Sequence, residues 1–263
     1  MGKEIKENMN KTIIPKWMYT LENYVVGNNE FVYEAVQAVI KNPGRIYTPL
    51  IIYGKNGDGK THLLHAIEDE IKKDSTLNVK YITTEQFVAD AVKALKNKEE
   101  QNYISLFKNI DVLLVDDFQF LSGKELIQKL FFDVFSAMIF SYKQVVITGD
   151  ALPEKMDINS EKFKYYLDMG LYAGILESDY NTRLEILKRK VKEANFQIEE
   201  ECLEYTAREF KGSNGRLIGL LERIIVLASL DNPKGEIDYE FIDRNIKFFE
   251  NAEHKEELEV NDA

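Results

Sequence analysis

The stretch that decides the fold is PLIIYGKNGDGKTHLLHAI, residues 49–67. It begins with an apolar run at 50–53, continues through a loop with three glycines and a lysine, and ends in a pattern typical of a helix. Within it, GKNGDGKT at 54–61 fits G-x-x-x-x-G-K-[S/T], the pattern of a phosphate-binding loop between a strand and a helix. A Gly-rich turn without function is the alternative, and the flanking strand and helix argue against it.

The loop residues suit phosphate chemistry. Glycines let successive backbone N–H groups point at phosphate oxygens, and the N-terminus of the next helix adds favourable dipole charge. We expect Lys60 to bridge the β- and γ-phosphates and Thr61 to ligate Mg²⁺. The residues expected to contact nucleotide here are Gly54, Asn56, Gly57, Asp58, Gly59, Lys60, Thr61 and His62.

The second motif is acidic. In VLLVDDFQFL, residues 112–121, an apolar run is followed by two carboxylates. Parallel strands bring their C-terminal ends to one edge of the sheet, where the phosphate loop also lies. Asp116 is expected to hold Mg²⁺ through water, and Asp117 to polarise the attacking water. In such enzymes most of the rate comes from positioning and charge stabilisation. The alternative, a solvated acidic turn, fits poorly beside a phosphate loop.

The rest of the chain predicts an α/β fold. Apolar runs alternate with helical patterns and show little polar alternation, which is typical of a parallel sheet covered by helices on both faces. The runs lie at 50–53, 79–83, 112–115 and 144–148. From Asp179 onward the spacing is helical, with Leu184, Leu187, Val191 and Ala194 as one set and Leu217, Leu220, Leu221 and Ile224 as another. We therefore predict an N-terminal segment (1–18), an α/β nucleotide-binding domain (19–177), a small helical domain (178–250) and an acidic tail (251–263).

Composition limits the classes of function. The 263 residues are 44% hydrophobic, and the single cysteine, Cys202, excludes an intramolecular disulfide. The formal charge of −11, from 34 basic and 45 acidic residues, disfavours binding to duplex DNA. No apolar run approaches the roughly 20 residues of a membrane span, and the charged N-terminus lacks a signal-peptide pattern. The sequence predicts a cytoplasmic protein without a membrane partner.

Two histidines, His62 and His65, are spaced one helical turn apart. A metal site is one interpretation, and packing behind the phosphate loop is the other. We favour packing, because the sequence offers no third ligand nearby.

Together these segments resemble the AAA+ ATPase domain of the bacterial replication initiator DnaA, from about Tyr19 to Phe249. The matching strings are YTLENYVVGNNEF, NPGRIYTPLIIYG, GDGKTHLLHAI, DAVKAL, DVLLVDDFQFLSGKE and QVVITGD. The resemblance implies an AAA+ P-loop NTPase fold with a helical lid and a site for ATP or ADP with Mg²⁺.

The resemblance also implies roles for residues outside the two motifs. Tyr24, Val25 and Val26 would line the adenine pocket. Asp150, at the end of VVITGD, would be the sensor 1 residue. Arg216 in GSNGRLIGLLERI matches sensor 2, the lid arginine that reaches back to the phosphates.

The sequence departs from the family at the arginine finger. The family segment reads roughly R-L-x-S-R-F-x-x-G-L, whereas this chain has KFKYYLDMGL at 162–171, with Lys162 at the first arginine and Tyr166 at the finger. A finger supplied in trans is worth roughly 10³ to 10⁵ in rate, so we do not expect this chain to activate hydrolysis on a neighbouring subunit. The family's origin-reading helix-turn-helix domain would follow about where this sequence ends, so no sequence-specific binding to duplex DNA is expected.

The residues that bind single-stranded DNA in this family are only partly present here. Val92 and Lys124 match the family, whereas Leu126 does not. The net acidic charge and the loss of one donor disfavour binding to single-stranded DNA.

Two functions follow from these features. The first is an ATP- or ADP-binding module that acts in replication initiation or its regulation by docking on a DnaA-type initiator or a related AAA+ replication protein, for example by capping an initiator filament. The second is a self-contained weak ATPase that serves as a small initiator or helicase loader on single-stranded DNA. The hydrolysis residues in cis for the second are Lys60, Thr61, Asp116, Asp117, Asp150 and Arg216. A P-loop kinase is a distant third, because no acceptor pocket is indicated.

Overall fold

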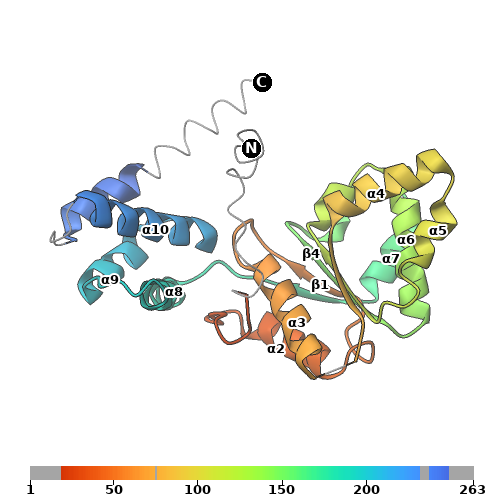
Figure 1. Ribbon diagram of the computed structural model, residues 1–263, viewed down its shortest axis with the longest axis horizontal. Coiled ribbons are helices and arrows are strands. Elements are labelled where there is room, and N and C mark those ends of the chain that lie inside the picture. The colour runs from red at the N-terminus through yellow and green to blue at the C-terminus, as the bar shows by residue number, and fades with distance from the viewer. Residues whose placement is uncertain (1–18, 75, 232–236, 249–263) are drawn as a thin grey trace, which may run out of the picture.

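The computed structural model describes residues 19–74, 76–231 and 237–248. Its centre is a five-stranded parallel sheet in the order β2-β3-β4-β1-β5 (Figure 1). The strands are β1 (Leu50–Tyr53), β2 (Val79–Thr83), β3 (Val112–Asp116), β4 (Gln144–Gly149) and β5 (Leu171–Gly174). The predicted α/β fold with a parallel sheet is confirmed, and both the N-terminal segment 1–18 and the tail 251–263 lie outside the described residues.

Burial differs between the middle and the edges of the sheet. The central strands β3 and β4 are buried along their whole length, as the apolar runs predict. The edge strands β2 and β5 are mostly half-buried. Both faces of each edge strand still pack against helices, as expected: Tyr81 and Ile82 of β2 contribute to different cores, and so do Ala173 and Tyr172 of β5.

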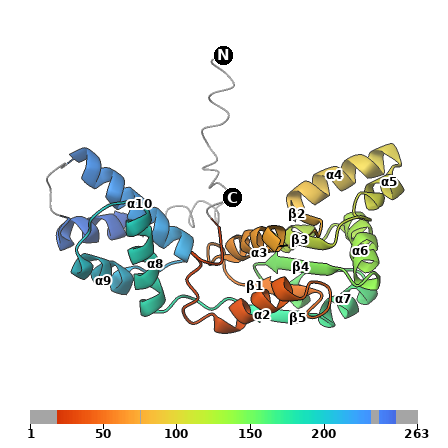
Figure 2. The same ribbon diagram turned by 60° about the horizontal axis from the view of Figure 1, so that its bottom comes forward.

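Two layers of helices cover the sheet (Figure 2). On one face, α2 (Glu30–Lys41) and α3 (Lys60–Asp74) pack over Leu50 and Ile52 of β1. The other face, which presents Ile51, is covered by α4 (Thr84–Asn97), α5 (Glu100–Ser105), α6 (Glu125–Phe140) and α7 (Glu161–Asp168). Alternate residues of one strand thus serve two separate cores, as the two-residue period of a strand requires. Short 3-10 turns, η2 (Phe118–Leu121) and η3 (Pro153–Lys155), follow β3 and β4.

The chain after the sheet is helical. It forms α8 (Tyr180–Glu193), α9 (Glu200–Glu209), α10 (Asn214–Asp231) and a last helix at 239–248. These helices share a core that includes the predicted residues Leu187, Val191, Leu217, Leu220, Leu221 and Ile224. Ala194, the last residue of the predicted helical set, is exposed and forms the C-cap of α8, because the helix ends at Glu193. Within the described residues, no helix has the length and apolar character needed to cross a membrane.

Candidate nucleotide site

The phosphate loop runs from the end of β1 to the start of α3, as predicted. Gly57 and Gly59 have φ values of +85° and +104°, in the left-handed region that favours glycine. The ammonium of Lys60 is almost fully buried and donates to the carbonyls of Gly54 at 2.7 Å and Lys55 at 3.0 Å. The loop therefore wraps its own lysine, with the charge held at the centre of the loop.

Asp116, at the end of β3, is 2% exposed and accepts hydrogen bonds on both carboxylate oxygens. Thr61 Oγ1 donates to Oδ2 at 2.9 Å, Tyr81 Oη donates to the same oxygen at 2.8 Å, and Thr148 donates to Oδ1. Mg²⁺ prefers carboxylate and hydroxyl oxygens, so Thr61 and Asp116 fit the ion that the motif implies. These two residues would hold Mg²⁺, which would neutralise phosphate charge.

Asp117 follows directly in a left-handed conformation, with φ +56°. Its backbone N–H donates to Thr148 Oγ1 at 3.2 Å, and Gln119 Nε2 donates to its carboxylate at 3.1 Å. Burial raises the pKa of Asp117, and the negative charge of Asp116 raises it further. Asp150, just after β4, is exposed, and its N–H donates to Gln119 Oε1 at 3.3 Å. Gln119 thus links the carboxylate of Asp117 to the backbone of Asp150. The roles of both aspartates in hydrolysis stay predictions.

The helical domain touches the phosphate loop through the first turn of α10. The N–H of Gly215 donates to the carbonyl of Gly57 at 2.8 Å. Asp58 is buried beside this contact; burial raises the pKa of its carboxyl, while Lys60 and the N–H of Asn214 lower it. Arg216 is partly buried in the same turn of α10. The structure therefore places the predicted lid arginine beside the loop.

A cavity of about 510 Å³ lies between residues 24–28 and the start of α8. The predicted adenine residues Tyr24, Val25 and Val26 line it, together with Gly27, Asn28, Asp179, Asn181, Thr182, Glu185 and Arg189. A Cβ added at Gly27 would lie 2.0 Å from Thr182 Oγ1, so only glycine allows the segment to approach α8 this closely. The cavity is therefore shared between the α/β and the helical parts of the chain.

Tyr24 connects this cavity to the phosphate loop. A Cβ added at Gly59 would lie 3.3 Å from the Tyr24 ring, so the ring packs against the loop backbone. Burial, and next the negative charge of Asp58, raise the pKa of Tyr24 to about 12. The phenol is therefore neutral at physiological pH.

His62 and His65, both on α3, pack among the rings of tyrosines from other segments. The Nε2 atom of His62 lies 2.8 Å from the carbonyl of Thr20, and the His62 ring contacts Tyr19 and Tyr24. Burial lowers the pKa of His62, which favours the neutral ring. His65 lies between Tyr19 and Tyr81, at ring distances of 5.8 and 4.3 Å. The described residues contain no cluster of three or more His, Cys, Asp or Glu that could hold a metal ion, and contact of His62 with nucleotide stays a prediction.

The sequence did not single out three residues of the site, namely Tyr81, Thr148 and Gln119. Each comes from a different strand or turn and reaches the acidic pair through a long or polar side chain. Thr148 carried a usable signal, since it closes the apolar run next to Asp150 and therefore lies at the same sheet edge as Asp116. Tyr81 carried none, because its direction depends on the register of β2 against β3.

The position of the family's arginine finger is aromatic. Tyr166 on α7 lies 5.9 Å from the ring of Phe132 and 5.7 Å from that of Phe140, both on α6. The Nζ atom of Lys162 lies 5.6 Å from the centroid of the Phe132 ring. Tyr165 and Phe140 are exposed, at 63% and 64%. Aromatic rings therefore surround the position at which the resemblance predicts a fixed cation.

The residues predicted for single-stranded DNA lie on α4 and at the start of α6. Val92 on α4 is half-buried against the core, and Lys124 donates to the carbonyl of Phe120 at 2.6 Å. Leu126, which departs from the family, is 68% exposed. Strand contact by this set stays a prediction.

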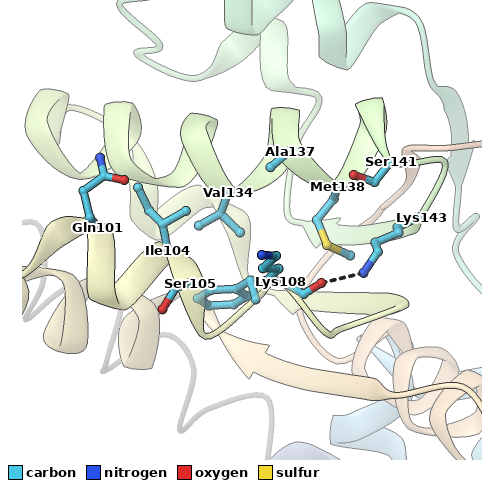
Figure 3. Close-up of a pocket in the computed structure, with 10 residues that line it drawn as sticks. Gln101, Ile104, Ser105, Lys108, Val134, Ala137, Met138, Ser141 and Lys143 are labelled. Atoms are coloured by element: carbon cyan, nitrogen blue, oxygen red, sulfur yellow. Dashed lines mark hydrogen bonds between the residues drawn. The ribbon is translucent and has the colours of Figure 1, made fainter.

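A smaller cavity, of about 230 Å³, lies between α5 and α6, away from the phosphate loop (Figure 3). Its walls carry apolar side chains such as Ile104, Val134 and Met138. Lys143 at its rim donates to the carbonyl of Lys108 at 2.8 Å, the bond drawn in Figure 3. The lysine charge is thus used within the fold.

The parallel sheet, the phosphate loop, the acidic end of β3 and the following helices define an AAA+ P-loop NTPase. Residues 16–174 match the family described as the bacterial DnaA ATPase domain. The chain belongs to this family.

Similar proteins agree with this assignment. The chromosomal replication initiator protein DnaA of Caldanaerobacter subterraneus is 37% identical over 257 residues, which cover 93% of this chain and 57% of that protein. The crystal structure of domain III of the Thermotoga maritima DnaA has a TM-score of 0.81 and 35% identity, covering 88% of this chain and 96% of that one. A DnaA bound to AMPPCP and single-stranded DNA has a TM-score of 0.73 and 36% identity, covering 80% and 65%. The chain thus spans a little over half the length of the curated relative.

Proposed function

We propose that this chain binds ATP or ADP with Mg²⁺ and acts in the initiation of DNA replication, or its regulation, by docking on a DnaA-type initiator or a related AAA+ replication protein. The observation that carries the proposal is an intact phosphate loop and Asp116 in a chain whose finger position holds Tyr166 among aromatic rings. The relative bound to AMPPCP supports adenine nucleotide as the ligand.

The two ends of the molecule then have unequal roles. The nucleotide side carries Lys60 and Arg216 and can accept a neighbour that supplies a finger. The side with Tyr166 offers a phenol, which carries no fixed positive charge. A finger in trans contributes roughly 10³ to 10⁵ in rate, so a neighbour facing this side stays in its ATP form. Such a chain can end an initiator filament.

The test mixes the full chain with a full-length DnaA-type initiator and ATP, and measures complex formation and phosphate release. We expect a complex without added hydrolysis. The Tyr166→Arg variant should raise phosphate release at least tenfold, because it restores the cation. Tyr165→Arg is the matched control, since it adds the same charge one residue away on an exposed ring. Absence of a complex would reject docking, and stimulation by the wild-type chain would reject the assignment of the finger.

A self-contained ATPase that acts on single-stranded DNA is the second candidate. It is favoured by the single strand bound to the relative and by Asp117 and Asp150, which share Gln119. Purified chain should then turn over ATP faster when single strands are added, and Lys60→Ala should abolish the rate. If the wild-type chain hydrolyses ATP no faster than Lys60→Ala does, only the first candidate is left.

A further inference from the structure

The hydroxyl of Tyr81 donates to Asp116 from outside both nucleotide motifs. Tyr81 pairs with Leu114 across β2 and β3, and Asp116 lies two residues beyond Leu114. Side chains two residues apart on a strand leave the same face, so Tyr81 and Asp116 both point toward α3. Their hydrogen bond, at 2.8 Å, spans neighbouring strands of the same sheet.

The Tyr81 ring is held from the α3 side. The His65 ring lies 4.3 Å from it, and Tyr19 stacks on His65 with an interplanar angle of 10°. The hydroxyl of the Tyr81 ring donates to Asp116. The donor is therefore held in position by the rings packed against it.

The carboxylate of Asp116 is consequently oriented by donors on both oxygens. Thr148 holds Oδ1, whereas Oδ2 takes both Tyr81 and Thr61. Thr61 is itself an expected ligand of Mg²⁺, so its hydroxyl has a second task. Tyr81 donates from β2, so its bond to Asp116 does not depend on Thr61.

We propose that Tyr81 is a positioning residue for the metal site: its hydroxyl fixes the carboxylate of Asp116 in the orientation that serves Mg²⁺ together with Thr61. The inference rests on the proposed nucleotide site. Mg²⁺ requires nearly ideal octahedral geometry, so the orientation of its few protein ligands matters. Loss of such an outer partner typically costs about 10- to 100-fold in metal affinity.

The experiment compares the wild-type chain, Tyr81→Phe and Tyr172→Phe. Tyr172 is the matched control, because its hydroxyl donates to Asp168 at the same 2.8 Å, on β5 at the opposite edge of the sheet. ATP affinity is measured by calorimetry in EDTA and at a series of free Mg²⁺ concentrations. We expect Tyr81→Phe to need about tenfold more Mg²⁺ for half of its effect on ATP affinity. Its affinity for ATP in EDTA should match the wild type, and Tyr172→Phe should match it in both conditions.

The outcomes separate this inference from the function on which it rests. If the wild-type chain binds no ATP, the proposed function fails. If the wild-type affinity depends on Mg²⁺ and Tyr81→Phe shows the same dependence, the inference alone is wrong. A loss of ATP affinity in EDTA, or a nucleotide-free melting temperature well below that of Tyr172→Phe, would show that the hydroxyl maintains the fold, and would also overturn the positioning role.

Discussion

Single residues of the site hold charge away from water. The ammonium of Lys60 and the carboxylate of Asp116 are both buried, and each is surrounded by groups that accept from or donate to it. Burial of a charge is tolerable only with such partners. A phosphate oxygen is a charged acceptor and binds an ammonium more strongly than a carbonyl does. We therefore expect Lys60 to exchange its bonds to Gly54 and Lys55 for phosphate when nucleotide binds.

Tyr24 gives a pH-dependent prediction at this scale. Its folded-state pKa of about 12 lies above the ordinary value of 10.0, because the ring is buried beside Asp58. The stability it provides is complete below pH 10 and is lost as the pH rises toward 12. One pKa unit corresponds to about 1.4 kcal/mol, so the loss is on the order of 2–3 kcal/mol.

The measurement is the free energy of unfolding in urea between pH 8 and pH 12 for the wild type and for Tyr24→Phe. The difference between the two proteins should shrink as the pH rises, because phenylalanine cannot ionise. A difference that stays constant across this range would show that Tyr24 does not titrate as its burial requires.

The phosphate loop could be predicted from sequence because its residues are consecutive, so that one pattern contains Gly54, Lys60 and Thr61. The partners of Asp116 could not be predicted in the same way. Tyr81 and Thr148 come from strands on either side of β3, and only the pairing register brings them to one carboxylate.

At the scale of elements, the site lies where one loop meets the start of one helix. The backbone of Gly57 accepts from Gly215 in α10, and a Cβ added at Gly57 would lie 2.5 Å from Ser213 Oγ. The loop can therefore touch the helical domain only while position 57 has no side chain.

Gly57→Ala should weaken both the loop and its contact with α10. Alanine at φ +85° is strained by about 1–2 kcal/mol, and the added methyl group pushes Ser213 away. We expect a lower melting temperature together with an ATP affinity reduced about tenfold, measured by thermal denaturation and calorimetry. Gly123→Ala is the matched control: it has φ +69°, but its nearest contact would be 3.6 Å away, so it should lose stability and keep its affinity. Equal affinity losses in the two variants would contradict a role for the contact with α10.

Elements were predictable in proportion to their apolar content. The runs that became β1, β3 and β4 are continuous and buried, and their positions follow from the sequence. The exposure of β2 does not follow, because an edge strand can be as apolar as a central one. The place where α10 meets the phosphate loop also had no sequence signal beyond the resemblance, since it depends on two glycines far apart in the chain, Gly57 and Gly215.

Across the whole molecule, the cores are separate and the connections between them are narrow. The helical core of α8, α9 and α10 is distinct from the two cores of the sheet. The connections described above run from Gly57 to Gly215 and from Gly27 to Thr182, and the guanidinium of Arg189 donates to the carbonyl of Glu22 at 3.1 Å. Each of these lies beside the phosphate loop or the cavity lined by Tyr24, so a nucleotide bound as predicted would contact both parts of the chain.

Nucleotide should therefore stabilise the helical domain as well as the loop. A ligand at about 100 times its Kd stabilises the folded state that binds it by about 2.7 kcal/mol. Where an amide exchanges only after that state opens, this stabilisation slows the exchange roughly 100-fold. We expect hydrogen exchange of the buried amides of α10, such as Leu217 and Leu220, to slow toward this limit when ADP and Mg²⁺ are added. Lys60→Ala, which should not bind the phosphates, is expected to show no slowing. Protection confined to residues 54–61, with α10 unchanged, would mean that the helical domain does not respond to nucleotide and that its contacts with the loop are passive.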